Sequence, residues 1–177
     1  MGPSAEPPRE AGRPHPELDV HVLSGPQDPL FPALAALCVT PEQEEFSGSF
    51  AYTLQDWAEA NSDDALLLAF LLDSTPVGLA LVKRGQAAPD WVPARAASLH
   101  GLKIATRYQG RGLGRLAMAG LMTALGTHWP ETDKLVLAVD AANDAALALY
   151  RDCGMRQMGP PHAGRLGPEY RIGLTLR

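Results

Sequence analysis

Apolar residues recur with the periods of strands and helices along nearly the whole chain after residue 17. Residues 18–23 read Leu-Asp-Val-His-Val-Leu, an alternation that is typical of a half-buried strand. Within residues 29–39, Leu30, Leu34 and Leu37 lie on one face of a predicted helix. The same two patterns predict strands over residues 65–72, 77–83, 97–104, 134–139 and 169–176 and helices over residues 54–60, 113–125 and 143–152.

Polar residues, prolines and glycines mark where these elements begin and end. Thr40 is a candidate N-cap for a helix that begins at Pro41, and the acidic stretch after this start, up to residue 53, is predicted to be irregular. Residues 73–76, Asp-Ser-Thr-Pro, have turn chemistry, so the strands on either side are predicted to form a hairpin. Residues 85–95 are predicted to form a loop, and Gly154 is the predicted C-cap of the helix over residues 143–152.

The composition is that of one globular domain with a tail. Residues 1–16 contain five prolines and almost no bulky apolar side chains, so they are predicted to be disordered, and residues 17–177 are predicted to form the domain. The chain has no run of the roughly 18 apolar residues that a membrane span needs, and its start lacks the apolar core of a signal peptide. We therefore expect a cytoplasmic protein with no membrane partner.

The net charge and the two cysteines indicate which kinds of partner and cofactor to expect. The formal net charge of −5 argues against nonspecific binding to nucleic acid and is compatible with a cationic small-molecule partner. Cys38 and Cys153 match no metal-ligand spacing, and both are predicted to pack in the core as small apolar residues. We expect no bound metal.

A glycine-rich loop lies between the strand over residues 97–104 and the helix over residues 113–125. Residues 109–114 read Gln-Gly-Arg-Gly-Leu-Gly and match the pattern Q/R-x-x-G-x-G/A. Glycines at a strand-to-helix junction let backbone N–H groups approach a phosphate, and the dipole of the following helix favours negative charge there. This pattern predicts a pyrophosphate-binding loop.

Two other glycine-rich phosphate sites fit the chain less well. A Walker-type loop needs Lys followed by Ser or Thr after its last glycine, whereas Arg115 and Leu116 follow Gly114. The dinucleotide pattern G-x-G-x-x-A does match residues 112–117, with Glu131 or Asp133 near the spacing of a ribose ligand. That turn normally follows the first strand of its domain, but here about a hundred residues precede it.

A second motif follows about thirty residues after the loop. Asn143 is at the predicted start of a helix, and Tyr150 lies about two turns further along the same face. Residues 143–155 read Asn-Asp-Ala-Ala-Leu-Ala-Leu-Tyr-Arg-Asp-Cys-Gly-Met and match the pattern N-x-x-A-x-x-L-Y-x-x-x-G-F/M. In order and spacing, the two motifs together resemble the GNAT superfamily of N-acetyltransferases, over roughly residues 18–177.

The resemblance implies a fold and a co-substrate. The fold would be α/β, with a mixed, mostly antiparallel sheet of six or seven strands, flanked by helices on both faces and splayed at its centre to admit acetyl-CoA. Main-chain groups on the strand before the loop would bond the pantetheine arm, and the loop amides would hold the pyrophosphate. The implied cofactor-binding residues are Leu102, Lys103, Ile104, Gln109, Gly110, Arg111, Gly112, Leu113, Gly114, Asn143 and Tyr150.

For some of these residues a second interpretation stays open. Arg111 and Arg115 would add charge-assisted contacts to phosphate, or would simply be solvated. Asn143 would contact the cofactor directly or through water, or would only cap its helix. Tyr150 would place its hydroxyl near the thioester sulfur as a general acid for the leaving thiolate, or would only pack the helix onto the sheet.

The resemblance also implies where the acceptor binds. His100 lies on a strand that resembles the strand of arylalkylamine-acetylating members with a catalytic His, and an imidazole with an ordinary pKa near 6.5 could take the proton of an amine. Many members instead have Glu near this strand, where Lys103 stands here. Glu42, Glu44 and Glu45 would line a pocket for a cationic acceptor, or would form a solvated helix start.

The activity implied is transfer of an acetyl group from acetyl-CoA directly to the primary amine of a small molecule such as a polyamine or an arylalkylamine. One alternative is a degenerate member that binds acyl-CoA as a sensor without turnover. A Rossmann-type NAD-binding oxidoreductase would instead need a parallel sheet and an acidic ribose ligand. We expect a monomer or a homodimer.

Overall fold

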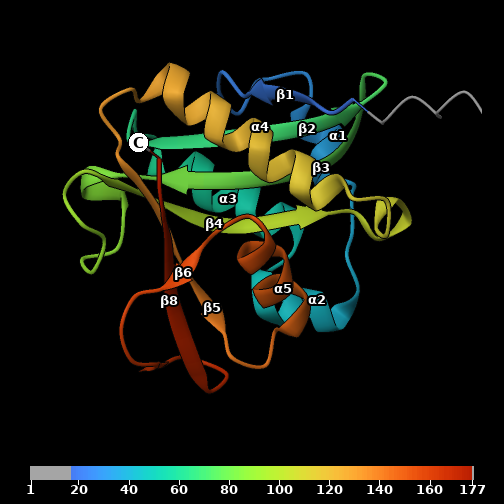
Figure 1. Ribbon diagram of the computed structural model, residues 1–177. Coiled ribbons are helices and arrows are strands. Elements are labelled where there is room, and N and C mark those ends of the chain that lie inside the picture. The colour runs from blue at the N-terminus through green and yellow to red at the C-terminus, as the bar shows by residue number, and fades with distance from the viewer. Residues whose placement is uncertain (1–16, 177) are drawn as a thin grey trace, which may run out of the picture.

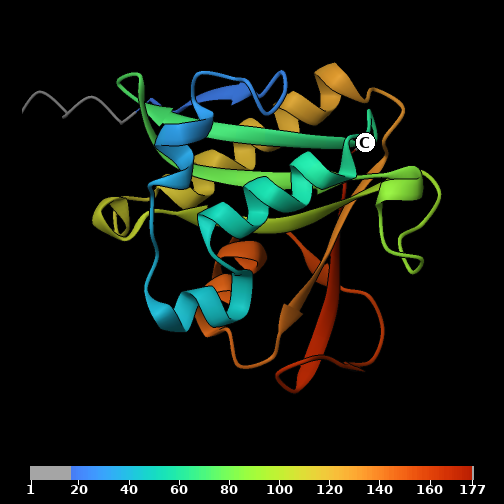
Figure 2. The same cartoon turned by 180° about the vertical axis from the view of Figure 1, so that it is seen from behind.

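The computed structural model describes residues 17–176, so the tail predicted over residues 1–16 lies outside the described residues. One sheet is covered by helices on both faces: α4 crosses one face (Figure 1), and α1 to α3 lie on the other (Figure 2). The strands are β1 (Asp19–Val22), β2 (Ala65–Leu72), β3 (Thr75–Lys83), β4 (Ala96–Ile104), β5 (Lys134–Asp140), β6 (Arg156–Gln157), β7 (His162–Ala163) and β8 (Pro168–Thr175). The α-helices are α1 (Phe31–Ala35), α2 (Pro41–Ser47), α3 (Phe50–Ala60), α4 (Leu113–His128) and α5 (Asp144–Asp152), and Gly85–Ala87 and Thr106–Tyr108 form single 3₁₀ turns.

The sheet is mixed and mostly antiparallel, as predicted. Its strand order is β1-β2-β3-β4-β5-β8-β6, with β7 paired to β8. Of the strand pairs in the described residues, only β4–β5 is parallel. Six strands match those predicted. The other two, β6 and β7, are each two residues long, which is too short for a pattern of alternating apolar residues. A sheet with a single parallel pair is incompatible with the parallel Rossmann architecture.

The predicted hairpin joins two strands that are buried on both faces. Asp73 and Ser74 turn the chain with φ of 48° and 63°, and β2 and β3 then pair antiparallel. In β2, Leu68 and Phe70 belong to the core beneath α4, whereas Leu67 belongs to the core beneath α1 and α3. Because both faces are covered, β2 is a continuous apolar run and not an alternating one.

The sheet divides between β4 and β5. These strands are paired only where residues 96–98 of β4 meet residues 134–136 of β5. Beyond this point β4 stays with β3 as far as Ile104, and β5 stays with β8 as far as Asp140. In both views β5 and β8 run at a steep angle to β1–β4. The edge of β4 after residue 98 that faces β5 therefore has no partner strand within the part of the chain that the structure describes.

A bulge in β4 accompanies this divergence. Gly101 has φ of 58°, and the pairing register with β3 shifts between Leu79 and Leu81. A left-handed residue inside a strand bends it and interrupts the ladder, and glycine takes this conformation without steric cost. The bend lies at the point where β4 leaves β5.

The first third of the chain differs from the prediction. α2 runs to Ser47 and α3 begins at Phe50, whereas this stretch was predicted to be irregular up to residue 53. The Thr40 cap is present as a capping box with Gln43, with bonds of 3.3 Å each way. The missed signal is Ser49, whose hydroxyl accepts from the N–H of Tyr52 at 3.0 Å and caps α3.

The prediction for Cys38 is wrong. α1 ends at Ala35, and residues 37–39 follow it as non-helical chain. Leu37 and Val39 are buried there, and Cys38 between them is exposed. A residue before proline disfavours the helical conformation, and Pro41 begins the next helix immediately after Thr40. Cys153, the other cysteine, is half-buried.

Two glycines of α4 give a matched pair of stability predictions. A Cβ at Gly120 would meet Cγ2 of Val20 in β1 at 2.4 Å, whereas a Cβ at Gly126 would meet nothing within 4 Å. Gly120→Ala is expected to destabilise the protein by about 1–3 kcal/mol through overpacking. Gly126→Ala is expected to stabilise it by about 0.5–1 kcal/mol, because alanine favours the helix. Urea denaturation of both variants measures these changes in stability. Equal midpoints would show that a Cβ at residue 120 does not clash with Val20.

Candidate functional site

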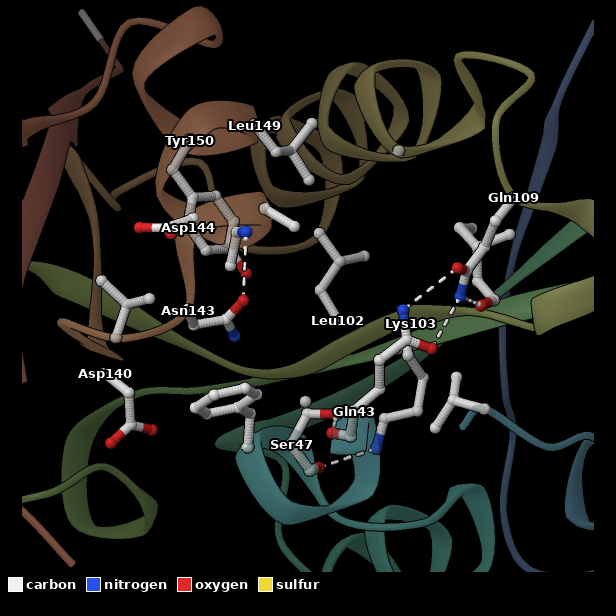
Figure 3. Close-up of a pocket in the computed structure, with 18 of the residues that line it drawn as sticks. Gln43, Ser47, Leu102, Lys103, Gln109, Asp140, Asn143, Asp144, Leu149 and Tyr150 are labelled. Carbon is white, nitrogen blue, oxygen red and sulfur yellow. Dashed lines mark hydrogen bonds between the residues drawn. The ribbon is translucent and has the colours of Figure 1, made fainter. Parts of the chain in front are cut away.

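A cavity of about 710 Å³ opens where β4 and β5 diverge. Its walls come from α2, the end of β4, the loop before α4, the end of β5 and the start of α5. In Figure 3, Tyr150 and Asn143 belong to one wall, and Leu102 and Lys103 of β4 belong to another. Two motifs that lie far apart in the sequence therefore line one cavity, and the unpaired edge of β4 lies between them.

The N-terminus of α4 is open toward this cavity. The N-cap residue, Gly112, has φ of 75° and offers no side-chain cap, and the first turn contains no acidic residue. The first N–H groups of a helix have no partner within the helix, so those of Leu113 and Gly114 remain available. A Cβ at Gly110 or Gly112 would meet nothing within 4 Å, so no atom of residues 17–176 covers this face of the loop. Such a helix end fits a phosphate group.

The N-terminus of α5 is different. The side-chain oxygen of Asn143 accepts from the N–H of Ala146 at 3.2 Å, and Asp144 lies in the first turn. The carboxylate and the capping oxygen already compensate the partial positive charge at the N-terminus of α5. Asn143 thus caps α5, and it also lines the cavity. The helix terminus available to an anion in this cavity is that of α4.

Gln109 ties the glycine loop to its surroundings through its side chain. Its Nε2 donates to the carbonyl of Ile104 at 2.7 Å, and its amide also pairs with the amide of Gln43 at 3.1 Å in each direction. Gln43 is a cavity residue that the sequence analysis did not identify. Its capping position after Thr40 was the available signal, but its partner is 66 residues away.

The arginines around the loop do not point into the cavity. Arg111 is not among the residues that line it, and its guanidinium donates to the carbonyl of Arg107 at 3.3 Å and lies over the ring of Tyr108. Arg115 pairs with Asp152. Their phosphate contacts stay predictions, because side chains this exposed can reorient.

The acidic residues that a dinucleotide site would need are engaged elsewhere. Glu131 pairs with Arg84, and Asp133 pairs with Arg95 at 2.8 Å. Both follow the C-terminal end of α4, at the opposite end of this helix from the glycine loop. Together with the mostly antiparallel sheet, this placement excludes the dinucleotide interpretation.

Tyr150 is a buried phenol in the cavity wall. Burial raises its pKa well above the ordinary value of 10, and the nearby Cys153 raises it further. The hydroxyl therefore keeps its proton at neutral pH. A neutral phenol in this position can donate a proton or a hydrogen bond to a group that gains negative charge.

His100 lines a second cavity of about 570 Å³. Phe46, Ser47, Leu99, Gly101 and Ala138 line both cavities, so the two adjoin along these residues. Burial lowers the pKa of His100 from 6.5 to about 4; the charge of Lys83 lowers it further, and Asp56 opposes the shift. Its Nε2 lies 2.8 Å from the hydroxyl of Ser98. The imidazole is therefore neutral at pH 7, and its pKa is not the ordinary value assumed in the sequence analysis.

The acidic residues of α2 divide between the two cavities. Glu42 lines the first, and Glu44 and Glu45 line the second. Asp56 also lines the second cavity, and the ammonium of Lys83 pairs with it at 2.8 Å. Among residues 17–176, neither Glu44 nor Glu45 forms an ion pair. The second cavity thus has two carboxylates outside ion pairs and one arginine in its lining, Arg165, whose guanidinium donates to the backbone carbonyl of Glu45.

The residues that the structure describes contain neither a membrane-spanning helix nor a cluster of metal-ligating side chains. Within residues 17–176, no helix is long and apolar enough to span a membrane. No group of three or more His, Cys, Asp or Glu side chains in the same residues is arranged to hold a metal ion.

Comparison with known proteins gives one family and many similar folds. The model of the acetyltransferase (GNAT) family matches residues 31–155. A solved aminoglycoside acetyltransferase AAC(6')-Ib in complex with coenzyme A is 17% identical, with a TM-score of 0.69 over 89% of this chain and 94% of that one. A spermidine N-acetyltransferase from Vibrio cholerae, in complex with CoA and spermine, is also 17% identical, with a TM-score of 0.69 over 90% and 96%. A search of curated protein sequences found no match.

Proposed function

Since this chain belongs to the acetyltransferase (GNAT) family, whose model matches more than half of its length, we propose that it transfers the acetyl group of acetyl-CoA directly to the primary amine of a small molecule. Family membership makes it an acetyltransferase. One observation above all supports acetyl-CoA as the donor: the uncapped N-terminus of α4 and the unpaired edge of β4 border the same cavity. An anion-binding helix end beside a strand edge suits a pyrophosphate linked to an amide-bearing arm.

The two edges would bind different parts of acetyl-CoA. The backbone of Leu102, Lys103 and Ile104 would pair with the pantetheine amides as a neighbouring strand does. The amides of residues 110–114 would bind the pyrophosphate, while Gln109 holds the loop on the carbonyl of Ile104. Asn143 would contact the arm through the side-chain nitrogen that its capping bond leaves over.

The chemical step needs a proton acceptor on the amine side and a donor on the thiolate side. The amine nitrogen attacks the thioester carbonyl, the C–S bond breaks, and one proton leaves the nitrogen. His100 in the second cavity would take this proton, directly or through water, and Tyr150 in the first would donate to the departing sulfur. A base and an acid in adjoining cavities support transfer without an acetylated enzyme intermediate.

The second cavity would hold the acceptor. Glu44 and Glu45 supply negative charge beside His100, which favours an amine that is cationic when free. Solved proteins of similar fold are aminoglycoside and spermidine acetyltransferases, so amino sugars and polyamines are the first acceptors to test, and the strand that contains His100 adds arylalkylamines. A screen of these amines with acetyl-CoA, followed by release of the free thiol, tests the proposal. Calorimetric binding of acetyl-CoA without turnover on any amine would instead indicate a sensor.

The pKa of His100 predicts an unusual pH profile. If His100 is the base, its neutral form is complete above pH 5, so the acidic limb of kcat/KM that belongs to it lies near pH 4. His100→Gln is expected to remove this limb and to lower kcat/KM by about tenfold at pH 7, because so weak a base contributes less than one with a pKa near the working pH. The amine itself must be neutral to attack, and its own titration lies several units higher.

Two acceptors of different basicity separate these titrations. The upper limb should move with the pKa of the acceptor, and the limb near pH 4 should not. If the variant keeps both limbs and the full rate, His100 takes no part in proton transfer, and ordered water or Glu44 and Glu45 become the candidates.

A further inference from the structure

Lys103 has a buried side chain that points toward the helix layer. Its ammonium donates to the carbonyls of Ser47, Gly48 and Ser49 at 2.8, 2.9 and 3.2 Å and to the hydroxyl of Thr53 at 2.8 Å. Four oxygens thus surround three protons, and no carboxylate is among them. Only 5% of the residue is exposed. A charge buried this deeply is tolerated because charge-assisted hydrogen bonds replace its water.

The carbonyls of Ser47 and Gly48 are at the C-terminal end of α2, whereas Ser49 is the N-cap of α3 and its carbonyl also accepts from the N–H of Thr53 at 3.2 Å. The last carbonyls of a helix have no partner within it and form the negative end of its dipole. The last turn of α2 contains no basic residue. Lys103 supplies the missing cation from β4, about 55 residues further along the chain. The side chain therefore caps α2 across the fold.

Charge is retained on this lysine at neutral pH. Burial lowers its pKa from 10.5 to about 8, and the nearby carboxylate of Glu44 opposes this shift. At pH 7 the ammonium form still predominates, so all three protons are available to the carbonyls.

The capped turn lies at the boundary of the two cavities. Ser47 lines both, while Gly48 and Thr53 line the second. On the other side, Gly101 lies so close that a Cβ there would be 2.9 Å from the hydroxyl of Thr53 and 3.4 Å from the ammonium of Lys103. The bulge in β4 and the turn thus meet at this one ammonium, beside the site proposed for the acceptor.

We propose that the side chain of Lys103 is a positioning residue that holds the α2–α3 turn against β4 and thereby shapes the acceptor side of the site. This inference rests on the proposed function, because it assigns the second cavity to the acceptor. The backbone of the same residue lies on the edge proposed for acetyl-CoA. The side chain and the backbone of Lys103 therefore serve different cavities, and a side-chain variant can separate them.

Lys103→Met keeps an unbranched side chain that is one heavy atom shorter and removes its charge. It is expected to raise KM for the amine about fivefold or more and to change the Kd of acetyl-CoA by less than about twofold, with a smaller effect on kcat. Thr53→Val keeps the branched shape and removes one of the four bonds of the ammonium, together with the weak bond of the hydroxyl to the carbonyl of Ser49 at 3.4 Å, so it should fold and should raise KM for the amine in the same direction. Leu125→Ala is the control: it creates a cavity in the core at the far end of α4, away from both cavities.

Hydrogen exchange of residues 47–53 gives a readout that needs no substrate. Exchange there should be faster in Lys103→Met and Thr53→Val than in the native protein, and unchanged in Leu125→Ala. Native exchange in both variants, or an unchanged KM for the amine, would overturn the proposal, as would equal KM increases in the Leu125→Ala control. Suppose that the native protein acetylates no amine, but that exchange is faster in Lys103→Met and Thr53→Val. The contact between Lys103 and the α2–α3 turn is then supported, and the proposed function is what fails.

Discussion

Tyr150→Phe is expected to lower kcat by about 10²–10⁴-fold while the Kd of acetyl-CoA stays nearly unchanged. The ring is buried in the core beneath α4 and α5, and phenylalanine fills the same space. Only the hydroxyl is lost, and that hydroxyl is the proposed donor to the departing thiolate. The raised pKa keeps it protonated, so the full enzyme population has the donor at neutral pH.

The measurement is single-turnover acetyl transfer, which reports chemistry without product release. Tyr170→Phe is the matched control, because Tyr170 is half-buried in β8 and lines neither cavity. The control should retain native kcat. A native single-turnover rate in Tyr150→Phe would limit Tyr150 to packing α5 onto the sheet. Partial replacement of the hydroxyl by water would place the loss at the lower end of the range.

Gly112→Val is expected to raise the Kd of acetyl-CoA about tenfold or more. Valine strains the left-handed conformation at φ of 75°, and its side chain would occupy the open face of the loop. The strain displaces the N–H groups at the start of α4, and the valine side chain keeps the pyrophosphate away from them.

Gly126→Val controls for the general cost of valine in place of glycine in this region. Gly126 is exposed in α4, its φ lies outside the left-handed range, and a Cβ there meets nothing. Calorimetry on the two variants, after their folding has been checked by circular dichroism, measures the difference. If folded Gly112→Val binds coenzyme A as tightly as the control does, the loop at residues 109–114 is not the pyrophosphate site.

Local sequence patterns predicted most of the fold, because most helices and strands are determined by residues within or next to them. The glycines at 110, 112 and 114 mark a strand-to-helix junction whatever lies around it, and the alternation in residues 18–22 survives as β1. The start of α3 was missed because its cap is a single serine, Ser49, and the residues just before it, 46–48, show no regular pattern of apolar positions. Cys38 was misplaced because Leu37 and Val39 fit a helix and an extended segment equally well.

The geometry of the site depended on contacts that no local pattern records. The partners of Lys103 lie about 55 residues before it, and the Gln43–Gln109 pair spans 66 residues. The lowered pKa of His100 arises from burial and from Lys83 on the neighbouring strand. The sequence motifs therefore predicted many residues that line the first cavity, and His100, Glu44 and Glu45 of the second were predicted as well, whereas the boundary between the two cavities was found only in three dimensions.

Transfer of a labelled acetyl group tests the central claim most directly. The purified protein is incubated with acetyl-CoA that contains a deuterated acetyl group and with a panel of polyamines, arylalkylamines and amino sugars, and the products are identified by mass spectrometry. We expect the label on a primary amine of at least one acceptor, with one free coenzyme A thiol released for each product. Binding of acetyl-CoA with no labelled amine at any acceptor, or a labelled protein in place of a labelled amine, would contradict direct transfer to a small-molecule amine.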